Sequence, residues 1–308
     1  MDCLNKKIGN GYALYNGDTC ELIRDIPDES VHCEIYSPPF SSLYTYSNSD
    51  RDLGNSKNDE QFFEHFRFIT TELFRILKPG RIMAVHCMNI PSTKERDGYI
   101  GLKDFRGDLI REFKEVGFIY HGEIAIWKDP VVQMQRTKAL GLLHKQIKKD
   151  SCMSRMGLPD YIVVMRKPGE NAEPVTHTNE TYPVSHWQEV ASPIWDYEFS
   201  PVWWDINQSD TLNIAAARDG RDERHICPLQ LPVIERLIDL YTNPNDIVFT
   251  PFMGIASEVY QAVKMGRRGI GIELKESYYK CAVENMEMLN TEKSQMNIFD
   301  FIGGKSDD

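Results

Sequence analysis

A hydroxyl, two prolines and an aromatic ring stand together in Ser37-Pro38-Pro39-Phe40, directly after the apolar run at residues 31–36. Two consecutive prolines cannot continue a sheet ladder, because neither has a backbone N–H to donate and both have a fixed φ. The predicted strand therefore ends at Ser37. The hydroxyl, the free carbonyls and the ring beyond it suit a planar partner that carries an NH2 group. A nucleobase with an exocyclic amine is such a partner; a plain X-Pro-Pro turn leaving a strand is the alternative.

A second group of such residues lies far downstream, at 247–273. The pattern predicts a strand at 247–250, a loop containing Gly254, a helix at 257–265 and a strand that ends at Glu273. Glu273 follows Gly254 by nineteen residues. At about this spacing a carboxylate reaches the ribose hydroxyls of a nucleotide lying across strand ends. A plain βαβ crossover remains the alternative.

Residues 131–158 carry a local excess of positive charge in a chain whose formal net charge is −11. The overall charge argues against a protein that coats nucleic acid nonspecifically. The local charge indicates either a solvated helix face or a contact with phosphates. The basic residues of this segment are Arg136, Lys138, Lys145, Lys148, Lys149 and Arg155.

Strands and helices alternate along the chain, and they must position these groups. This alternation predicts an α/β fold with a largely parallel sheet and helices on both faces. Residues 170–214 are predicted to be rich in loops, and 303–308 to be a polar tail. The predicted helices are 62–77, 109–116 and 232–241, and further buried strands are 81–87, 117–127 and 160–165.

Length and composition set limits on the class of protein. The 308 residues predict one large α/β domain with an insertion, or two domains. No run of eighteen apolar residues and no signal-peptide pattern is present, so we expect a cytoplasmic protein with no membrane contact. The seven cysteines are scattered without a Cys-x-x-Cys pair, which predicts reduced thiols and no metal site.

Taken together, these motifs resemble the β group of amino DNA methyltransferases that depend on S-adenosylmethionine. Ser37-Pro38-Pro39-Phe40 matches the catalytic tetrad of that family. Pro251-Phe252-x-Gly254 and Gly271-Ile272-Glu273 match its cofactor loop and ribose acid. Asn16-Gly17-Asp18 resembles the motif on the adenine side of the cofactor, and the segment 227–230 resembles the one that cups its methionine end.

The resemblance implies a mostly parallel, seven-stranded Rossmann-like sheet with a circularly permuted motif order and an inserted target-recognition region. It divides the chain into a catalytic half (1–128), the insertion (129–212, with a late sheet strand near 160–167), a cofactor-binding half (213–290) and a tail (291–308). It also implies a prokaryotic or phage-infected cell and association with the nucleoid.

The implied reaction moves a methyl group from S-adenosylmethionine to an exocyclic amine of a base flipped out of double-stranded DNA. Ser37 Oγ and the Pro38 carbonyl would accept from the amine and Phe40 would stack on the base, with no strong general base or metal required. Serine at the first tetrad position favours cytosine N4, and adenine N6 is the alternative. The family context admits a homodimer and a cognate restriction nuclease as partners. The cofactor-binding residues implied are Asp18, Thr250, Pro251, Phe252, Gly254 and Glu273.

Two positions depart from the family pattern. Thr250 stands where the cofactor loop usually begins with Asp, and Ala256 stands where it has a second glycine. We expect weaker cofactor binding, by roughly ten- to a hundredfold for one lost charge-assisted hydrogen bond. They also keep another class open, a DNA-binding protein on a decayed methyltransferase scaffold. Methylation of RNA or protein amines is a further alternative. Separately, we expect the loop at 41–58 to close over the bound base.

Overall fold

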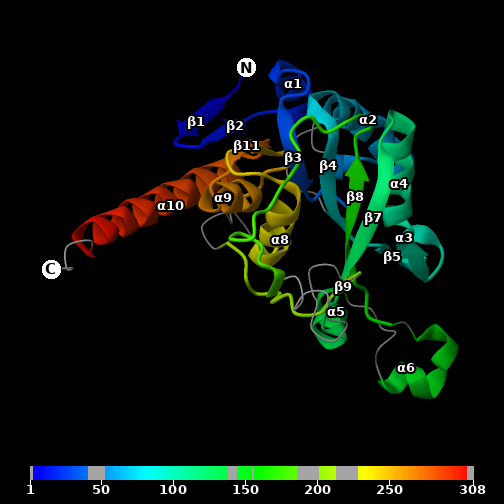
Figure 1. Ribbon diagram of the computed structural model, residues 1–308. Coiled ribbons are helices and arrows are strands. Elements are labelled where there is room, and N and C mark those ends of the chain that lie inside the picture. Colours follow the sequence, from blue (N-terminus) through cyan, green and yellow to red (C-terminus); the bar gives the residue numbers. More distant parts are fainter. Residues whose placement is uncertain are drawn as a thin grey trace.

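The computed structural model describes residues 3–40, 53–137, 144–154, 156–185, 201–212 and 228–303, and its centre is one nine-stranded sheet (Figure 1). The strand order is β1-β2-β11-β10-β3-β4-β8-β7-β9. Five neighbouring strands within it run parallel, which confirms the mostly parallel sheet. They are β2 (Tyr12–Asn16), β11 (Arg268–Glu273), β10 (Ile247–Thr250), β3 (Val31–Tyr36) and β4 (Leu77–Cys87).

The other four strands make the sheet mixed. β8 (Asp160–Arg166) runs antiparallel to β4 and to β7 (Ile119–Ile126). At the two edges, β1 (Asn5–Gly9) forms a hairpin with β2, and the two-residue β9 (Val202–Trp203) pairs with β7. The predicted count of seven strands is therefore wrong. Neither edge strand can be predicted from hydrophobic periodicity, because β1 is mostly exposed and β9 is too short to show alternation.

Helices cover both faces of the sheet, as predicted, because the central strands are buried on both sides (Figure 1). Tyr36 of β3 packs in the core beneath one set of helices, and Cys33 and Ile35 pack in the core on the opposite face. The first set is α1 (Thr19–Leu22), α2 (Asp59–Ile76) and α4 (Phe105–Val116). The second set is α8 (Leu231–Tyr241), α9 (Ser257–Lys264) and α10 (Glu276–Gly303).

α10 extends beyond the sheet in Figure 1 and continues the chain as helix to Gly303, where a tail from residue 291 was expected. None of the helices in the described ranges is long and apolar enough to cross a membrane. The shorter elements are β5 (Ile90–Ser92), α3 (Lys94–Asp97), β6 (Gly101–Lys103), α5 (Pro130–Thr137) and α6 (His144–Lys149), and 3-10 turns occur at Ile23–Asp25, Leu53–Asn55 and Ser151–Met153.

A buried ion pair holds the amino-terminal edge of the sheet together. Arg81 is 1% exposed; it pairs with Asp246 before β10 and donates to the backbone oxygens of His32 and Glu173, each at 2.9 Å. His32, Glu173 and Asp246 lie close enough together for a metal ion. Lys78 already supplies a cation there, since its Nζ lies 2.8 Å from His32 Nε2 and 2.7 Å from Glu173 Oε1. We therefore interpret the cluster as a structural network.

The opposite edge of the sheet gathers the sequence motifs. Because β2, β11, β10, β3 and β4 run parallel, the loops that follow them all leave at one edge. β8 is antiparallel to β4 and therefore begins at that edge. Strand direction thus places the tetrad after β3, the Gly254 loop after β10 and Glu273 at the end of β11 side by side.

Candidate active site

The loops after β2, β10 and β11 are tied into one corner by hydrogen bonds. Gly17 N donates to the Glu273 carbonyl at 2.9 Å, and Asn16 Nδ2 donates to the same oxygen at 2.8 Å. Thr19 Oγ1 donates to the Pro251 carbonyl at 2.6 Å. Asp18 lies between these residues in the chain and caps α1, accepting from Cys20 N at 2.9 Å. The structure therefore brings together Asp18, the β10 loop and Glu273, which are distant in the sequence.

Glu273 bridges two of these loops through its carboxylate. Its Oε2 accepts from Gly254 N at 2.7 Å, and its Oε1 accepts from Lys275 N at 2.8 Å. Gly254 has a φ of +55°, and a Cβ built there would meet no described atom within 4 Å. The glycine is thus required by its backbone conformation, and it leaves space in which a ligand can approach the loop.

The two departures from the family pattern lie in the same corner. Thr250 is fully buried, and its Oγ1 has no hydrogen-bond partner among the described residues; the same holds for Ser257 Oγ. Ala256 has a φ of +72°, the left-handed backbone that favours glycine. Its methyl group is fully buried in a core cluster with Met253 and Val259. Unpartnered buried oxygens and an open glycine fit a polar ligand that enters this corner.

The tetrad leaves β3 beside this corner. Ser37 Oγ lies 2.7 Å from His86 Nδ1 at the end of β4. The Phe40 ring packs edge-on against His86 and Phe105, with centroid distances of 6.3 and 6.2 Å. Phe252, in the β10 loop, lies against Tyr36 at 5.9 Å. Ser37, Phe40 and Phe252, which the sequence analysis identified, are thus held in place by contacts with neighbouring side chains.

Three residues behind Ser37 were missed by the sequence analysis. His86 Nε2 lies 2.9 Å from Asp160 Oδ2, and Lys128 pairs with the same carboxylate oxygen. Burial raises the pKa of Asp160, but His86 and Lys128 together outweigh burial, so the pKa lies below its ordinary value and the group is ionised. The sequence did place His86 near the end of one predicted buried strand and Asp160 at the start of another, but it gave no sign that the two residues meet. Only the antiparallel pairing of β4 with β8 brings them together.

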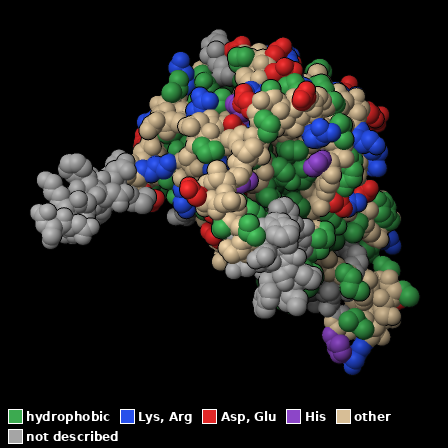
Figure 2. Space-filling view, in the orientation of Figure 1, with side chains coloured by type: hydrophobic (Ala, Val, Ile, Leu, Met, Phe, Trp, Pro, Cys, Tyr) green, Lys and Arg blue, Asp and Glu red, His purple; other side chains and the backbone are tan. Residues whose placement is uncertain are grey.

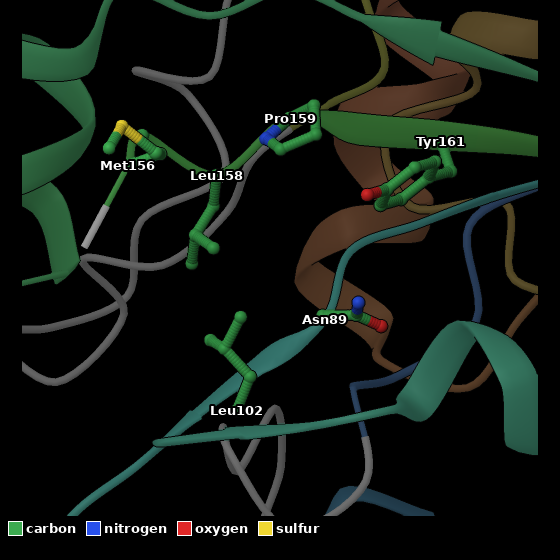
Figure 3. Close-up of a pocket in the computed structure, with 7 residues that line it drawn as sticks. Asn89, Leu102, Met156, Leu158, Pro159 and Tyr161 are labelled. Carbon is green, nitrogen blue, oxygen red and sulfur yellow. The ribbon is translucent and has the colours of Figure 1, made fainter. Parts of the chain in front are cut away.

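A cavity of about 310 Å³ opens at the same edge, on the β8 side of the tetrad (Figure 3). Leu102 and Leu158 face each other across it, and Met156 and Tyr161 lie towards its two ends. Asn89, which follows β4, also lines it. The cavity is separated from the β10 loop by β3 and β4, so it is distinct from the corner that contains Gly254.

The predicted phosphate-contacting residues lie on a projection. α6 leads into β8, projects away from the sheet in Figure 1 and has no buried residue; Lys and His side chains gather at its tip (Figure 2). It carries Lys145, Lys148 and Lys149, all exposed. Arg136 lies in α5, and Lys138 and Arg155 lie outside the described residues.

Some other expected features also fall outside the described ranges, namely Cys227 and residues 41–52 of the loop predicted to close. The rest of the 227–230 segment leads into α8, with Leu229 and Gln230 buried. Trp203 is a core residue, and its neighbour Trp204 is 57% exposed.

The chain is similar to known DNA methyltransferases along most of its length. It is 25% identical over 292 residues to the type II methyltransferase M.BglII of Bacillus subtilis, covering 93% of this chain and 71% of that protein. It is 24% identical over 293 residues to the DNA adenine methyltransferase YhdJ of Escherichia coli, covering 93% and 86%.

The fold is shared with TTHA0409 of Thermus thermophilus, a putative DNA modification methylase solved in complex with S-adenosyl-L-methionine. The TM-score is 0.63 at 21% identity, over 91% of this chain and 96% of that one. The N6/N4 family model described as DNA methylase matches residues 31–284, which include the tetrad, the β10 loop and Glu273. The chain therefore belongs to the N6/N4 DNA methylase family.

Proposed function

We propose that this protein transfers a methyl group from S-adenosylmethionine to the exocyclic amine of a base in double-stranded DNA, with cytosine N4 as the preferred acceptor. The observation that carries the proposal is the placement of Ser37 and Phe40 directly after β3, whose last residue, Tyr36, packs against Phe252 of the β10 loop. A methyl donor in the Gly254 corner and a base against Phe40 would then lie at one sheet edge. Family membership supports the reaction class.

S-Adenosylmethionine supplies an electrophilic methyl group when it is bound. Backbone N–H groups of Gly254 and Lys275 hold the Glu273 carboxylate at the end of β11, where ribose hydroxyls would donate to it. Gly254 leaves its backbone open, and Asp18 is held nearby on the α1 turn. The remaining residues that we assign to the cofactor are Thr250, Pro251 and Phe252.

The acceptor base would leave the duplex, at a cost of a few kcal/mol, and stack on Phe40. Ser37 Oγ and the Pro38 carbonyl would accept from its amine, and Pro39 would keep that carbonyl in place through its fixed φ. The rate then arises mainly from alignment of the amine with the methyl group.

The larger organisation of the chain is part of the proposal. Residues 1–128 and 213–290 would form the catalytic and cofactor-binding halves in circularly permuted order, and 129–212 the target-recognition insertion. The insertion contains β8 and β9, so it would contribute strands to the sheet as well as DNA contacts. Within the insertion, α6 carries the exposed lysines Lys145, Lys148 and Lys149 ahead of β8.

Adenine N6 is the second candidate acceptor. The similarity to YhdJ favours it, whereas the serine at the first tetrad position favours cytosine. Both amines are planar NH2 groups that a hydroxyl and a carbonyl can hold, so the geometry of Ser37 alone does not separate them.

Mass spectrometry of nucleosides tests the proposal directly. DNA is incubated with the protein and S-adenosylmethionine that carries a labelled methyl group, then digested. Labelled N4-methylcytosine is the expected product, and labelled N6-methyladenine would establish the second candidate. If calorimetry shows DNA binding but no cofactor binding, and no labelled base forms, the protein is a DNA-binding scaffold instead.

Restoring the missing carboxylate should strengthen cofactor binding. In Thr250→Asp we expect the affinity for S-adenosylmethionine to rise by roughly ten- to a hundredfold, because a carboxylate at this buried position can pair with the methionine ammonium. The free protein should unfold at a lower temperature, since the new charge is buried without a partner. Calorimetric titration measures the affinity. Thr250→Asn, which is similar in size but uncharged, is the matched control and should gain much less.

Reversing two charges on α6 should weaken DNA binding. The double variant Lys148→Glu/Lys149→Glu should bind duplex DNA less tightly, and the dependence of log affinity on log salt should become shallower by about 2. Fluorescence anisotropy at several salt concentrations measures both quantities. The control Lys6→Glu/Lys114→Glu makes the same change in net charge at exposed positions in β1 and α4. Equal effects in the two variants would contradict a specific role for α6.

A further inference from the structure

A buried chain of polar contacts runs from the tetrad into the sheet. Ser37 Oγ is 2.7 Å from His86 Nδ1, His86 Nε2 is 2.9 Å from Asp160 Oδ2, and Lys128 pairs with that carboxylate. The three side chains behind Ser37 are 10%, 2% and 14% exposed, respectively. Burying a polar group costs folding free energy unless it forms hydrogen bonds or ion pairs. Contacts with one another reduce this cost for Ser37, His86, Asp160 and Lys128 and hold the four side chains in place.

The ionised state of Asp160 fixes the direction of the hydrogen bonds. A carboxylate only accepts, so the proton of the neutral imidazole lies on Nε2 and points to Asp160. Nδ1 then presents a lone pair, and the Ser37 hydroxyl donates to it. The lone pairs of Ser37 Oγ are left for a partner in front of the tetrad. In this way His86 makes Ser37 an acceptor, as binding of an NH2 group requires.

We propose that His86 is the positioning residue and proton acceptor of the methylation reaction and acts through Ser37. The proposal rests on the proposed function. Methylation would form an N–C bond to the methyl group as its bond to the sulfur of S-adenosylmethionine breaks, and the amine would lose one N–H bond, so one proton must leave the nitrogen. That proton forms a new O–H bond at Ser37 Oγ while the original Ser37 proton moves to His86 Nδ1. Asp160 stabilises the resulting imidazolium, which returns the proton to solvent after the product leaves.

Lys128 sets how readily His86 takes a proton. Lys128 pairs with the Asp160 oxygen that also faces His86, so its positive charge opposes the negative charge of Asp160 at the imidazole. On the neighbouring elements, Arg106 of α4 and Glu123 of β7 pair with each other at 2.8 Å, so they add no net charge. Asp160 and Lys128 are the charged groups in this chain of contacts, so removing one or the other changes the electrostatic potential at His86 in opposite directions.

The test combines a pH–rate profile with a measurement that does not need turnover. Single-turnover methylation is followed from pH 5 to pH 9 with saturating duplex DNA and S-adenosylmethionine. The imidazole resonances of 15N-labelled histidine are titrated in the same protein, and His86 is identified by its absence in His86→Asn. Asparagine can still accept from Ser37, but it cannot take up a proton.

His86→Asn should lower the single-turnover rate by about 10²-fold or more, leave the KM for DNA unchanged and remove the acidic limb of the profile. Lys128→Met should move that limb, and the His86 resonance, to higher pH, because Asp160 then acts unopposed. Asp160→Asn should move both to lower pH. A purely structural role for these residues would not produce shifts of opposite sign.

Two outcomes overturn the proposal. One is a wild-type protein that methylates DNA while His86→Asn keeps its rate and its acidic limb. The other is a His86 resonance that does not move in opposite directions in Lys128→Met and Asp160→Asn. If Asp160→Asn does not fold, Lys128→Met still predicts a shift of known direction, since Lys128 is the most exposed of the three residues. Failure of the proposed function looks different, because the wild-type protein itself would then form no methylated nucleoside.

Discussion

Phe40→Ala is expected to slow methylation by about ten- to a hundredfold, because stacking of a base on an aromatic ring contributes roughly 1–3 kcal/mol. Ser37→Ala should also slow the reaction, since it removes the hydroxyl that accepts from the amine. The two residues lie on the base side of the proposed site, so calorimetry should show unchanged binding of S-adenosylmethionine in both variants. Single-turnover rates with duplex DNA measure the loss.

The control for this prediction is Phe40→Tyr, which keeps the aromatic face and should retain most of the rate. Phe40 also packs against His86 and Phe105, so circular dichroism must show that the alanine variant remains folded. If Ser37→Ala and Phe40→Ala both methylate DNA at the wild-type rate, the tetrad is not the acceptor site.

The largest effect on stability is expected for Asp246→Ala. Arg81 is 1% exposed and Asp246 7%, so removing the carboxylate leaves a buried guanidinium without its counter-charge. Breaking such a pair costs about 3–5 kcal/mol of unfolding free energy. Asp246 also accepts from Asn243 N at 2.8 Å, and that contact is lost as well. Urea denaturation followed by circular dichroism gives the free energy directly.

Asp205→Ala provides the comparison, because Asp205 pairs with Arg236 at a more exposed position, where it is itself 36% exposed. Its loss should cost no more than about 1 kcal/mol. The double variant Arg81→Met/Asp246→Leu removes both charges and should recover much of the loss. Equal destabilisation by Asp246→Ala and Asp205→Ala would show that burial does not set the cost.

The repeating strands and helices were predictable because each has a clear period. The strand at 31–36, the strand pair at 247–250 and 268–273 and the helix between them all occur within a residue or two of the expected ends. Proline and glycine punctuation marked where these elements stop. The two edge strands could not be predicted, because pairing at an edge depends on a neighbour and not on a hydrophobic pattern.

At the tetrad, too, some residues could be predicted from the sequence and others could not. Ser37 and Phe40 were predicted because Pro38 and Pro39 force the strand to end there. His86 and Asp160 were not, since their contact joins strands seventy-four residues apart and exists only in the antiparallel register of β4 and β8. Sequence spacing indicates local geometry well, but the register between distant strands is set by the packed sheet.

The pairing of β7 with β8 has a consequence for how this protein can change over time. Ile126 and Asp160 are paired at the edge that carries the tetrad, so the connection between β7 and β8 starts and ends at this pair. Doubling the length of such a loop costs only about 0.6 kcal/mol of closure entropy. The loop can therefore be lengthened, shortened or exchanged while the sheet and the tetrad keep their geometry. Under the proposed function, grafting a different connection between these strands would change the DNA sequence that is recognised and leave the proposed catalytic residues unaltered.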